Sequence, residues 1–294
     1  MSTFDFAVVG SPFLDLTFAG LPRVPGPGEE VVAQELHLGP GGTGMQAIGA
    51  SRLGLSAALV SPIGDDPAGE VLRTMLSADG VEWIGQRNGS TPTTAILSTP
   101  DGSAMATAFD EAEPTAQDVA GVDARAFVLS LGRLPLRPPG AAVYATTGGI
   151  ELDAGVDVGG VSFEGVRALI ANEREASRIT GADDASSAAS ALAADVESVV
   201  VTLGPDGAVA FEHGREVRAK APDLDVVDTT GAGDLFVAAY VWADLRGLDI
   251  DTRIAWATLY AGLSVRAPTA FAGALRLAEL LTQGERRGLV ASGP

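Results

Sequence analysis

Short apolar runs separated by helix-like segments dominate the chain and predict a buried sheet covered by helices. Residues 6–9 are apolar and are closed by Gly10, as in a strand buried on both faces. The same pattern predicts strands at 56–61, 198–203 and 208–211 and helices at 45–53, 67–80, 233–245 and 252–265. Residues 132–165 are rich in Gly and Pro and predict no definite element. The alternation is typical of a three-layer α/β/α fold with a mostly parallel central sheet.

Two polar stretches of strand-like sequence depart from this pattern. Residues 31–38 are half polar and follow a segment rich in Pro and Gly, which favours an exposed antiparallel strand. Residues 93–108 form a second stretch with a Pro-Asp-Gly turn inside it. We expect a small β lid, contributed by about 12–40 and 92–110, on a single domain that spans 1–294.

Composition limits the available chemistry. The 294 residues include 19 Lys and Arg against 38 Asp and Glu, so the formal net charge is −19. Such a surface repels phosphate backbones and anionic lipids, and we expect neither nucleic acid nor membrane partners. Cysteine is absent and His37 and His213 are the only histidines, which excludes thiolate zinc sites, Cys nucleophiles and multi-His metal sites. Carboxylates, hydroxyls and backbone amides remain.

The sequence contains neither a long apolar run nor a leader-like start. No segment reaches the roughly 18 apolar residues of a membrane helix. The first residues lack a basic region and carry Asp5 where a signal peptide would be apolar. We therefore expect a cytoplasmic protein.

The strongest motif is the heptad Asp228-Thr229-Thr230-Gly231-Ala232-Gly233-Asp234, followed by the apolar segment 235–243. Small residues at a helix start let backbone amides approach an anion, and the helix dipole favours negative charge there. A carboxylate at the same point could accept a proton from a hydroxyl nucleophile. Phosphoryl transfer needs both. The alternative is an ordinary glycine-rich turn with Asp234 as a helix cap.

The heptad resembles the C-terminal signature of the ribokinase-like (PfkB-type) carbohydrate kinases. Further segments resemble motifs of that family in the same order: Val8-Val9-Gly10-Ser11 with Asp15, Gly41-Gly42 through Arg52-Leu53-Gly54, Ile63-Gly64-Asp65-Asp66, Asn172-Glu173-Arg174-Glu175-Ala176, and Thr202-Leu203-Gly204-Pro205-Asp206-Gly207. Six ordered matches are more specific than any one of them. The resemblance implies a ribokinase-like fold and an ATP-dependent kinase that phosphorylates a hydroxymethyl group of a sugar or nucleoside.

The resemblance also implies roles for individual residues. Asp234 would be the catalytic base, and Gly231, Ala232 and Gly233 would form the anion hole. Asp15, Gly41, Gly42 and Gln46 would hold the acceptor. Asn172, Thr202, Gly204, Gly207 and Thr258 would bind the nucleotide, Glu175 would act on Mg²⁺ through water, and Asp228 with Thr230 would bind a monovalent cation such as K⁺.

Several of these residues also have a purely structural interpretation. Asp15 could be a turn residue, and residues 202–207 alone are a plain hairpin turn. Asn172 with Glu175 fits a capping box, in which a helix N-cap pairs with a Glu three positions on. Asp228 and Thr230 could simply brace the loop.

The first signature departs from the family pattern. The family's sugar-binding Asn is missing: counted from Arg52 the position is Met45, and counted from Gly41 a one-residue deletion brings Gln46 near it. Thr43 stands where phosphosugar kinases of the family often carry Lys, which implies a neutral acceptor. Residues 266–274 diverge from the loop that would complete the cation site.

Three further hypotheses concern function and assembly. Residues 39–44 match Gly-x-Gly-x-x-Gly, but the preceding strand is half polar, which argues against a dinucleotide site, and no Walker-type P-loop occurs. The missing Asn leaves open a catalytically idle sugar or nucleotide sensor, whereas the intact Asp234 favours a kinase. The exposed lid strands predict a homodimer formed through the lid.

Overall fold

The computed structural model describes residues 4–108, 112–153, 155 and 160–291, and its centre is a nine-stranded sheet. The strand order is β13-β12-β11-β10-β9-β8-β1-β4-β5. The strands are β1 (Phe4–Val9), β4 (Ala57–Val60), β5 (Glu82–Ile84), β8 (Ala124–Ser130), β9 (Ala142–Thr146), β10 (Val166–Asn172), β11 (Ser198–Thr202), β12 (Ala208–Glu212) and β13 (Arg215–Ala219). From β5 to β11 along this order, neighbouring strands pair in parallel, and β12 and β13 add antiparallel pairs at the other edge. The predicted mostly parallel sheet is confirmed.

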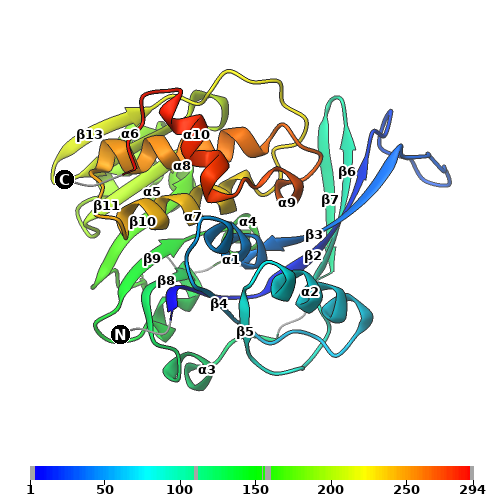
Figure 1. The fold of residues 1–294 in the computed structure, drawn as a ribbon, viewed down its shortest axis with the longest axis horizontal. Coiled ribbons are helices and arrows are strands. Elements are labelled where there is room, and N and C mark those ends of the chain that lie inside the picture. The colour runs from blue at the N-terminus through cyan, green and yellow to red at the C-terminus, as the bar shows by residue number, and fades with distance from the viewer. Residues whose placement is uncertain (1–3, 109–111, 154, 156–159, 292–294) are drawn as a thin grey trace.

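Helices cover both faces of this sheet (Figure 1). One face packs against α1 (Thr43–Arg52), α2 (Pro67–Ala78), α7 (Ala232–Asp244), α8 (Ile250–Ser264) and α10 (Leu277–Glu285). The other packs against α3 (Ala116–Ala120), α5 (Glu173–Thr180) and α6 (Ala185–Leu192). Two short helices, α4 (Gly149–Asp153) and α9 (Ala270–Gly273), complete the set. Alternate residues of β1 enter the two cores, since Phe6 joins one and Ala7 the other.

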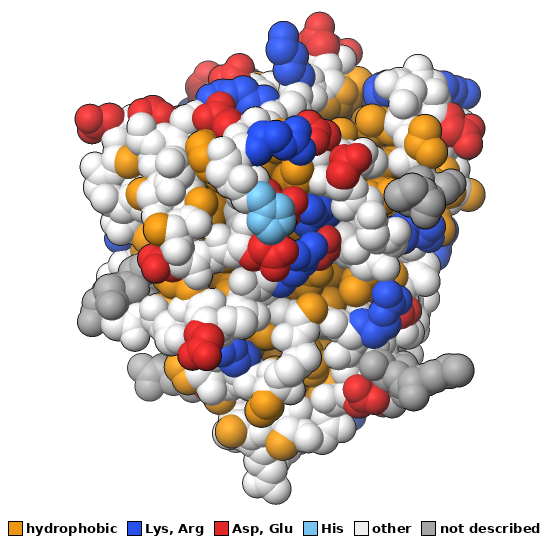
Figure 2. All heavy atoms as spheres, turned by 90° about the vertical axis from the view of Figure 1, so that its left-hand side faces the viewer, with side chains coloured by type: hydrophobic (Ala, Val, Ile, Leu, Met, Phe, Trp, Pro, Cys, Tyr) orange, Lys and Arg blue, Asp and Glu red, His pale blue; other side chains and the backbone are white. Residues whose placement is uncertain are grey.

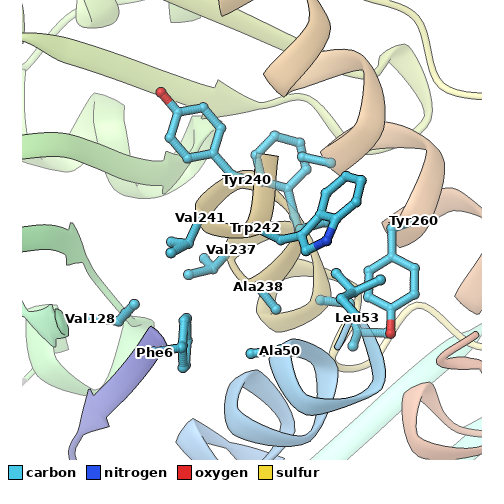
Figure 3. Packing of buried hydrophobic residues seen from close by; sticks show 14 of the residues in the cluster. Phe6, Ala50, Leu53, Val128, Val237, Ala238, Tyr240, Val241, Trp242 and Tyr260 are labelled. Carbon is cyan, nitrogen blue, oxygen red and sulfur yellow. The ribbon is translucent and has the colours of Figure 1, made fainter. Parts of the chain in front are cut away.

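Helix α7 is buried along most of its length. All residues from Leu235 to Ala243 are buried, which explains why this segment is almost wholly apolar. Figure 3 shows Val237 and Val241 turned toward Phe6 and Val128 of the sheet, while Ala238 lies toward Ala50 of α1. The start of α7 is therefore held at a fixed place above the sheet.

The lid is a separate four-stranded sheet that projects from one side of the molecule (Figure 1). Its order is β3-β2-β6-β7, with β2 (Pro12–Ala19), β3 (Glu35–Gly42), β6 (Thr93–Thr99) and β7 (Gly102–Ala108). The predicted strand at 31–38 lies too early in the chain: β3 starts at Glu35 and continues through the glycines to Gly42. The cause is its pairing with β2, which runs from Pro12↔Gly42 to Ala19↔Glu35. Residues 109 and 110 of the predicted lid lie outside the described residues.

Elements also form where the sequence pattern predicted none. A 3₁₀ helix covers Leu131–Leu136, and β9 and α4 follow it within 132–165. Strand β9 is short, and its flanks are the Pro- and Gly-rich residues that obscured it. No helix in the described part of the chain is long and apolar enough to cross a membrane.

The C-terminal end of α7 is tied to three other elements. The Asp244 carboxylate accepts hydrogen bonds from Tyr144 Oη of β9 at 2.5 Å, Arg167 Nη2 of β10 at 3.0 Å and Arg253 Nη1 of α8 at 2.9 Å. This cluster belongs to the side of the molecule remote from the lid. The surface there carries acidic and basic side chains close together around a histidine (Figure 2).

Candidate active site

The heptad 228–234 forms a tight loop that opens α7. The Thr230 amide and hydroxyl both donate to Asp228 Oδ1, at 3.0 and 2.8 Å, which fixes the turn. Gly231 is the N-cap of α7 and has a φ of 79°, in the left-handed region that glycine adopts without strain. A Cβ at Gly231 would also lie 2.8 Å from Ala270 Cβ. Both observations explain why glycine stands there.

Asp234 lies in the first turn of α7, and its carboxylate is held from a second helix. Gln46 Nε2 of α1 donates to Asp234 Oδ1 at 2.9 Å. Burial raises the pKa of Asp234 to about 7, the hydrogen bond from Gln46 opposes this rise, and the charges of Asp15 and Glu175 add to it. A carboxylate with a pKa near neutrality is suited to accept a proton from an alcohol.

Asp15 is the second acidic group of the site, and it lies on lid strand β2. Its carboxylate packs against the backbone of Gly41, where an added Cβ would come within 2.2 Å of Asp15 Oδ2. Burial raises the pKa of Asp15 to about 6, a hydrogen bond with Thr94 lowers it, and the charge of Asp228 raises it. The predicted acceptor residues Asp15 and Gly41 are thus brought together.

A small cavity of about 20 Å³ lies between the lid and the body. Asp15 and Ile96 line it from the lid, and Met45, Asp228 and Gly231 line it from the body. The volume is enough for one water-sized species. Asp228 is buried and its Oδ2 has no hydrogen-bond partner in the described part of the chain.

A second, much larger cavity of about 620 Å³ opens on the other side of the loop. All five residues predicted to bind the nucleotide line it: Asn172, Thr202, Gly204, Gly207 and Thr258. Most of the remaining wall is apolar, with Pro222 and Phe236 among its residues. Pockets of this size and character are typical of small-molecule sites.

The glycine loop separates the two cavities. Gly231 lines the small one, and Ala232 and Gly233 line the large one; Asp234 follows them in the chain and lines neither cavity itself. The Ala232 amide is engaged within the loop, since it donates to the Thr229 carbonyl at 3.2 Å. The loop is therefore placed to face a group passing from one cavity to the other.

The capping box predicted at Asn172 and Glu175 is confirmed. The Glu175 amide donates to Asn172 Oδ1 at 2.9 Å, and the Asn172 amide donates to Glu175 Oε2 at 3.0 Å, at the start of α5. Burial raises the pKa of Glu175, although the hydrogen bonds with Asn172 oppose this. Asn172 faces the large cavity, whereas Glu175 is not among its lining residues.

Two predicted acceptor residues, Gly42 and Gln46, line neither cavity. Conversely, Met45 and Phe271 line the small cavity and Pro222 lines the large one without having been predicted. These apolar residues carry no chemical signature, because apolar residues are as common in cores as in pockets. For Met45 the one available signal was its place opposite the missing Asn.

Comparisons with known proteins identify the family of this chain. A model described as pfkB family carbohydrate kinase matches residues 5–139 and 162–274. A 2-dehydro-3-deoxygalactonokinase of Haloferax volcanii is 30% identical over 249 residues, covering 74% of this chain and 78% of the relative. An acarbose 7(IV)-phosphotransferase of Actinoplanes is 28% identical over 302 aligned residues, covering 94% of this chain and 97% of the relative. The ribokinase of Mus musculus is 30% identical over 288 aligned residues, covering 88% of each chain.

Solved structures share the fold. A putative ribokinase from Agrobacterium tumefaciens superposes with a TM-score of 0.82 at 19% identity, covering 97% of this chain and 98% of the other. The ribokinase of Arabidopsis thaliana complexed with ribose and ATP gives a TM-score of 0.76 at 24% identity, covering 96% and 98%. The predicted ribokinase-like fold is confirmed.

Proposed function

Because this chain belongs to the pfkB family of carbohydrate kinases, we propose that it transfers a phosphoryl group from ATP to a hydroxymethyl group of a sugar or nucleoside, with Asp234 as the general base. One observation carries the proposal. The loop 231–233 borders both cavities, so a phosphoryl group bound at the loop is in reach of an acceptor on one side and a nucleotide on the other.

Each part of the loop has a task in this reaction. Asp234 accepts the proton of the acceptor hydroxyl as the oxygen attacks the terminal phosphorus of the nucleotide. The amides of Gly231 and Gly233 at the N-terminus of α7 and the helix dipole stabilise the negative charge of the transferring group. The Ala232 amide donates to the Thr229 carbonyl and braces the loop. A raised pKa suits Asp234 to this role, since a stronger base takes the proton more readily.

The acceptor is held by Asp15 and the backbone around Gly41 and Gly42. The ionised Asp15 carboxylate accepts hydrogen bonds from acceptor hydroxyls, and glycine at 41 leaves the space that this carboxylate occupies. Thr43 supplies no positive charge at this end, which favours a neutral acceptor over a sugar phosphate. Asn172, Thr202, Gly204, Gly207 and Thr258 line the nucleotide side, where ATP is the donor.

The acidic groups fit metal ions in two places. Glu175 would act on Mg²⁺ through water beside the nucleotide phosphates, since its capping partner Asn172 lines the large cavity and Mg²⁺ keeps several of its waters when bound. Mg²⁺ neutralises phosphate charge and orients the phosphates. Asp228, with its buried unpartnered Oδ2, and Thr230 would hold a monovalent cation such as K⁺ at the small cavity.

The alternative is a catalytically idle sensor that binds a sugar or nucleotide. A coupled assay of ADP release, run across pentoses, hexoses and nucleosides with ATP and Mg²⁺, separates the two. We expect at least one acceptor to stimulate turnover in the wild type and not in Asp234→Asn. Binding of sugars in a thermal-shift panel, without acceptor-stimulated turnover for any of them, would establish the sensor.

A further inference from the structure

We infer that Gln46 is a positioning residue for the general base: its side-chain amide holds the Asp234 carboxylate in the orientation that proton transfer requires. The inference rests on the proposed function, in which Asp234 receives the acceptor proton. It differs from the acceptor-binding role that the sequence predicted for Gln46.

The geometry commits the Gln46 amide to the base. The Gln46 side chain is only 7% exposed, and its Nε2 donates to Asp234 Oδ1 at 2.9 Å. Gln46 lines neither the small cavity beside Asp15 nor the nucleotide cavity. With Oδ1 engaged, the other carboxylate oxygen of Asp234 is left for the acceptor hydroxyl, so one hydrogen bond fixes both the orientation of the base and the oxygen that reacts.

Gln46 also has a feature that a purely structural side chain would avoid. Its Oε1 is buried and has no hydrogen-bond partner in the described part of the chain. An unpaired buried acceptor destabilises the folded state, and an apolar side chain of the same length would not incur this cost. Fold stability alone therefore does not explain a glutamine at position 46.

The close packing of α1 against α7 fixes the distance between the amide and the carboxylate. Gly49 follows Gln46 by one helical turn and faces α7, where an added Cβ would lie 2.8 Å from Leu235 Cδ2 and 3.0 Å from Ala238 Cβ. Ala238 is one turn beyond Asp234. The two helices thus touch through Gly49 and Ala238, and the same faces one turn earlier bring Gln46 to Asp234.

The substitution Gln46→Met tests the role, because methionine keeps the length and removes the donor. We expect kcat to fall about 10- to 100-fold, the range for a lost hydrogen bond to a charged group. The KM of the acceptor should stay within about twofold. The acid limb of the kcat profile should move to higher pH, because the remaining influences on Asp234 (burial and the charges of Asp15 and Glu175) all favour its protonated form. The melting temperature should not fall.

A double-mutant cycle tests whether the effect passes through the base. In the Asp234→Asn background, Gln46→Met should change the residual kcat by less than about twofold. Independent, multiplicative losses would overturn the inference. So would a large rise in the acceptor KM with an unchanged pH profile, since this would return Gln46 to acceptor binding.

A titration that needs no turnover separates this inference from the proposed function. In protein labelled with ¹³C at the aspartate carboxyl groups, the signal absent from Asp234→Asn reports the base directly. We expect its pKa to be higher in Gln46→Met than in the wild type, whatever acceptor the enzyme uses. Equal pKa values in the two proteins would overturn the inference, whereas a lack of kinase activity with the shift present would overturn only the function.

Discussion

Asp234 is a carboxylate whose surroundings favour its neutral form, and this has opposite consequences for activity and stability. Its pKa of about 7 in the folded protein lies above the ordinary value of 3.8, chiefly because the group is buried. A general base works only when ionised, so if Asp234 has this role we expect kcat to fall as the pH drops below about 7.

Substituting Asn for Asp234 should lower kcat by about 10²–10⁴ and leave nucleotide binding intact, as measured by steady-state kinetics and calorimetry. A variant retaining half of the wild-type kcat would refute the assignment.

The same pKa predicts a pH-dependent gain in stability for Asp234→Asn. Because the folded pKa is raised, ionisation opposes folding: the wild type keeps its full stability below about pH 4 and loses part of it as the pH rises from about 4 to 7. Asparagine does not ionise. The melting temperature of the variant should therefore exceed that of the wild type at pH 8, and the difference should shrink toward pH 4.

Asp15 should affect the acceptor alone. Hydrogen bonds to a charged carboxylate contribute about 1.5–3 kcal/mol each, so Asp15→Ala should raise the acceptor KM at least tenfold. The KM of ATP should be nearly unchanged, because Asp15 lines the small cavity and not the nucleotide cavity. Asp15→Asn is the matched control, since it keeps the shape and one acceptor oxygen. An unchanged acceptor KM in both variants would leave Asp15 with only a structural role in strand β2.

Glu175 allows its capping and metal roles to be separated by one substitution. Glu175→Gln keeps the capping box, because Gln serves at that position as Glu does, so the melting temperature should hardly change. If the carboxylate acts on Mg²⁺ through water, the variant will need distinctly more free Mg²⁺ for half-maximal activity. Superimposable Mg²⁺ titrations of the two proteins would show that the carboxylate is structural.

At the scale of residues, the sequence predicted which residues of a local motif share a cavity, but it did not predict contacts between motifs far apart in the chain. The five residues predicted for the nucleotide side all line one cavity, and four of them, Asn172, Thr202, Gly204 and Gly207, lie in or beside a turn or helix cap that the sequence shows. The contact between Gln46 and Asp234 joins positions 188 apart in the chain, and it depends on how two helices cross. Local pattern holds no information on such a crossing, so the partner of Gln46 could not be predicted.

At the scale of elements, the close contact between α1 and α7 should be sensitive to a single larger side chain at Gly49. Gly49→Val would place three carbons where a Cβ alone is already within 3.0 Å of Ala238, and such overpacking costs about 1–3 kcal/mol. We expect a lower melting temperature and a lower kcat, because the added side chain pushes α1 away from α7 and so moves Gln46 away from Asp234. Gly121→Val is the control, since nothing lies within 4 Å of a Cβ there. Equal effects of the two substitutions would contradict this account.

Elements with strong local signals were predicted closely, and those defined by their neighbours were not. Helix α2 has the expected Asp66 cap and begins at Pro67, and α7 agrees with the predicted helix at 233–245 to within a residue at each end. Strand β3 was misplaced because its glycines disfavour strands, while pairing with β2 holds them in one. Here tertiary pairing outweighs intrinsic propensity.

For the whole molecule, the lid predicts assembly. Its edge strands β3 and β7 expose large apolar side chains, with Leu36 55%, Leu38 41% and Met105 56% accessible. Apolar groups gathered on unpaired sheet edges favour association with a second copy. We expect a dimer in sedimentation at micromolar concentration, and a monomer for Leu36→Glu with Met105→Lys. A monomeric wild type would contradict this prediction and leave the kinase proposal intact.

The anchoring of Asp244 decides which part of the molecule must move in each catalytic cycle. The small cavity has room for little more than one water-sized species, so we expect the walls around Asp15 to separate when an acceptor enters. Helix α7 is held against this motion, because β9, β10 and α8 all hydrogen-bond its far end through Asp244. We therefore expect the lid strands to move while the loop 231–233 stays in place. Opening and product escape, rather than proton transfer, then become the steps that can limit the turnover rate.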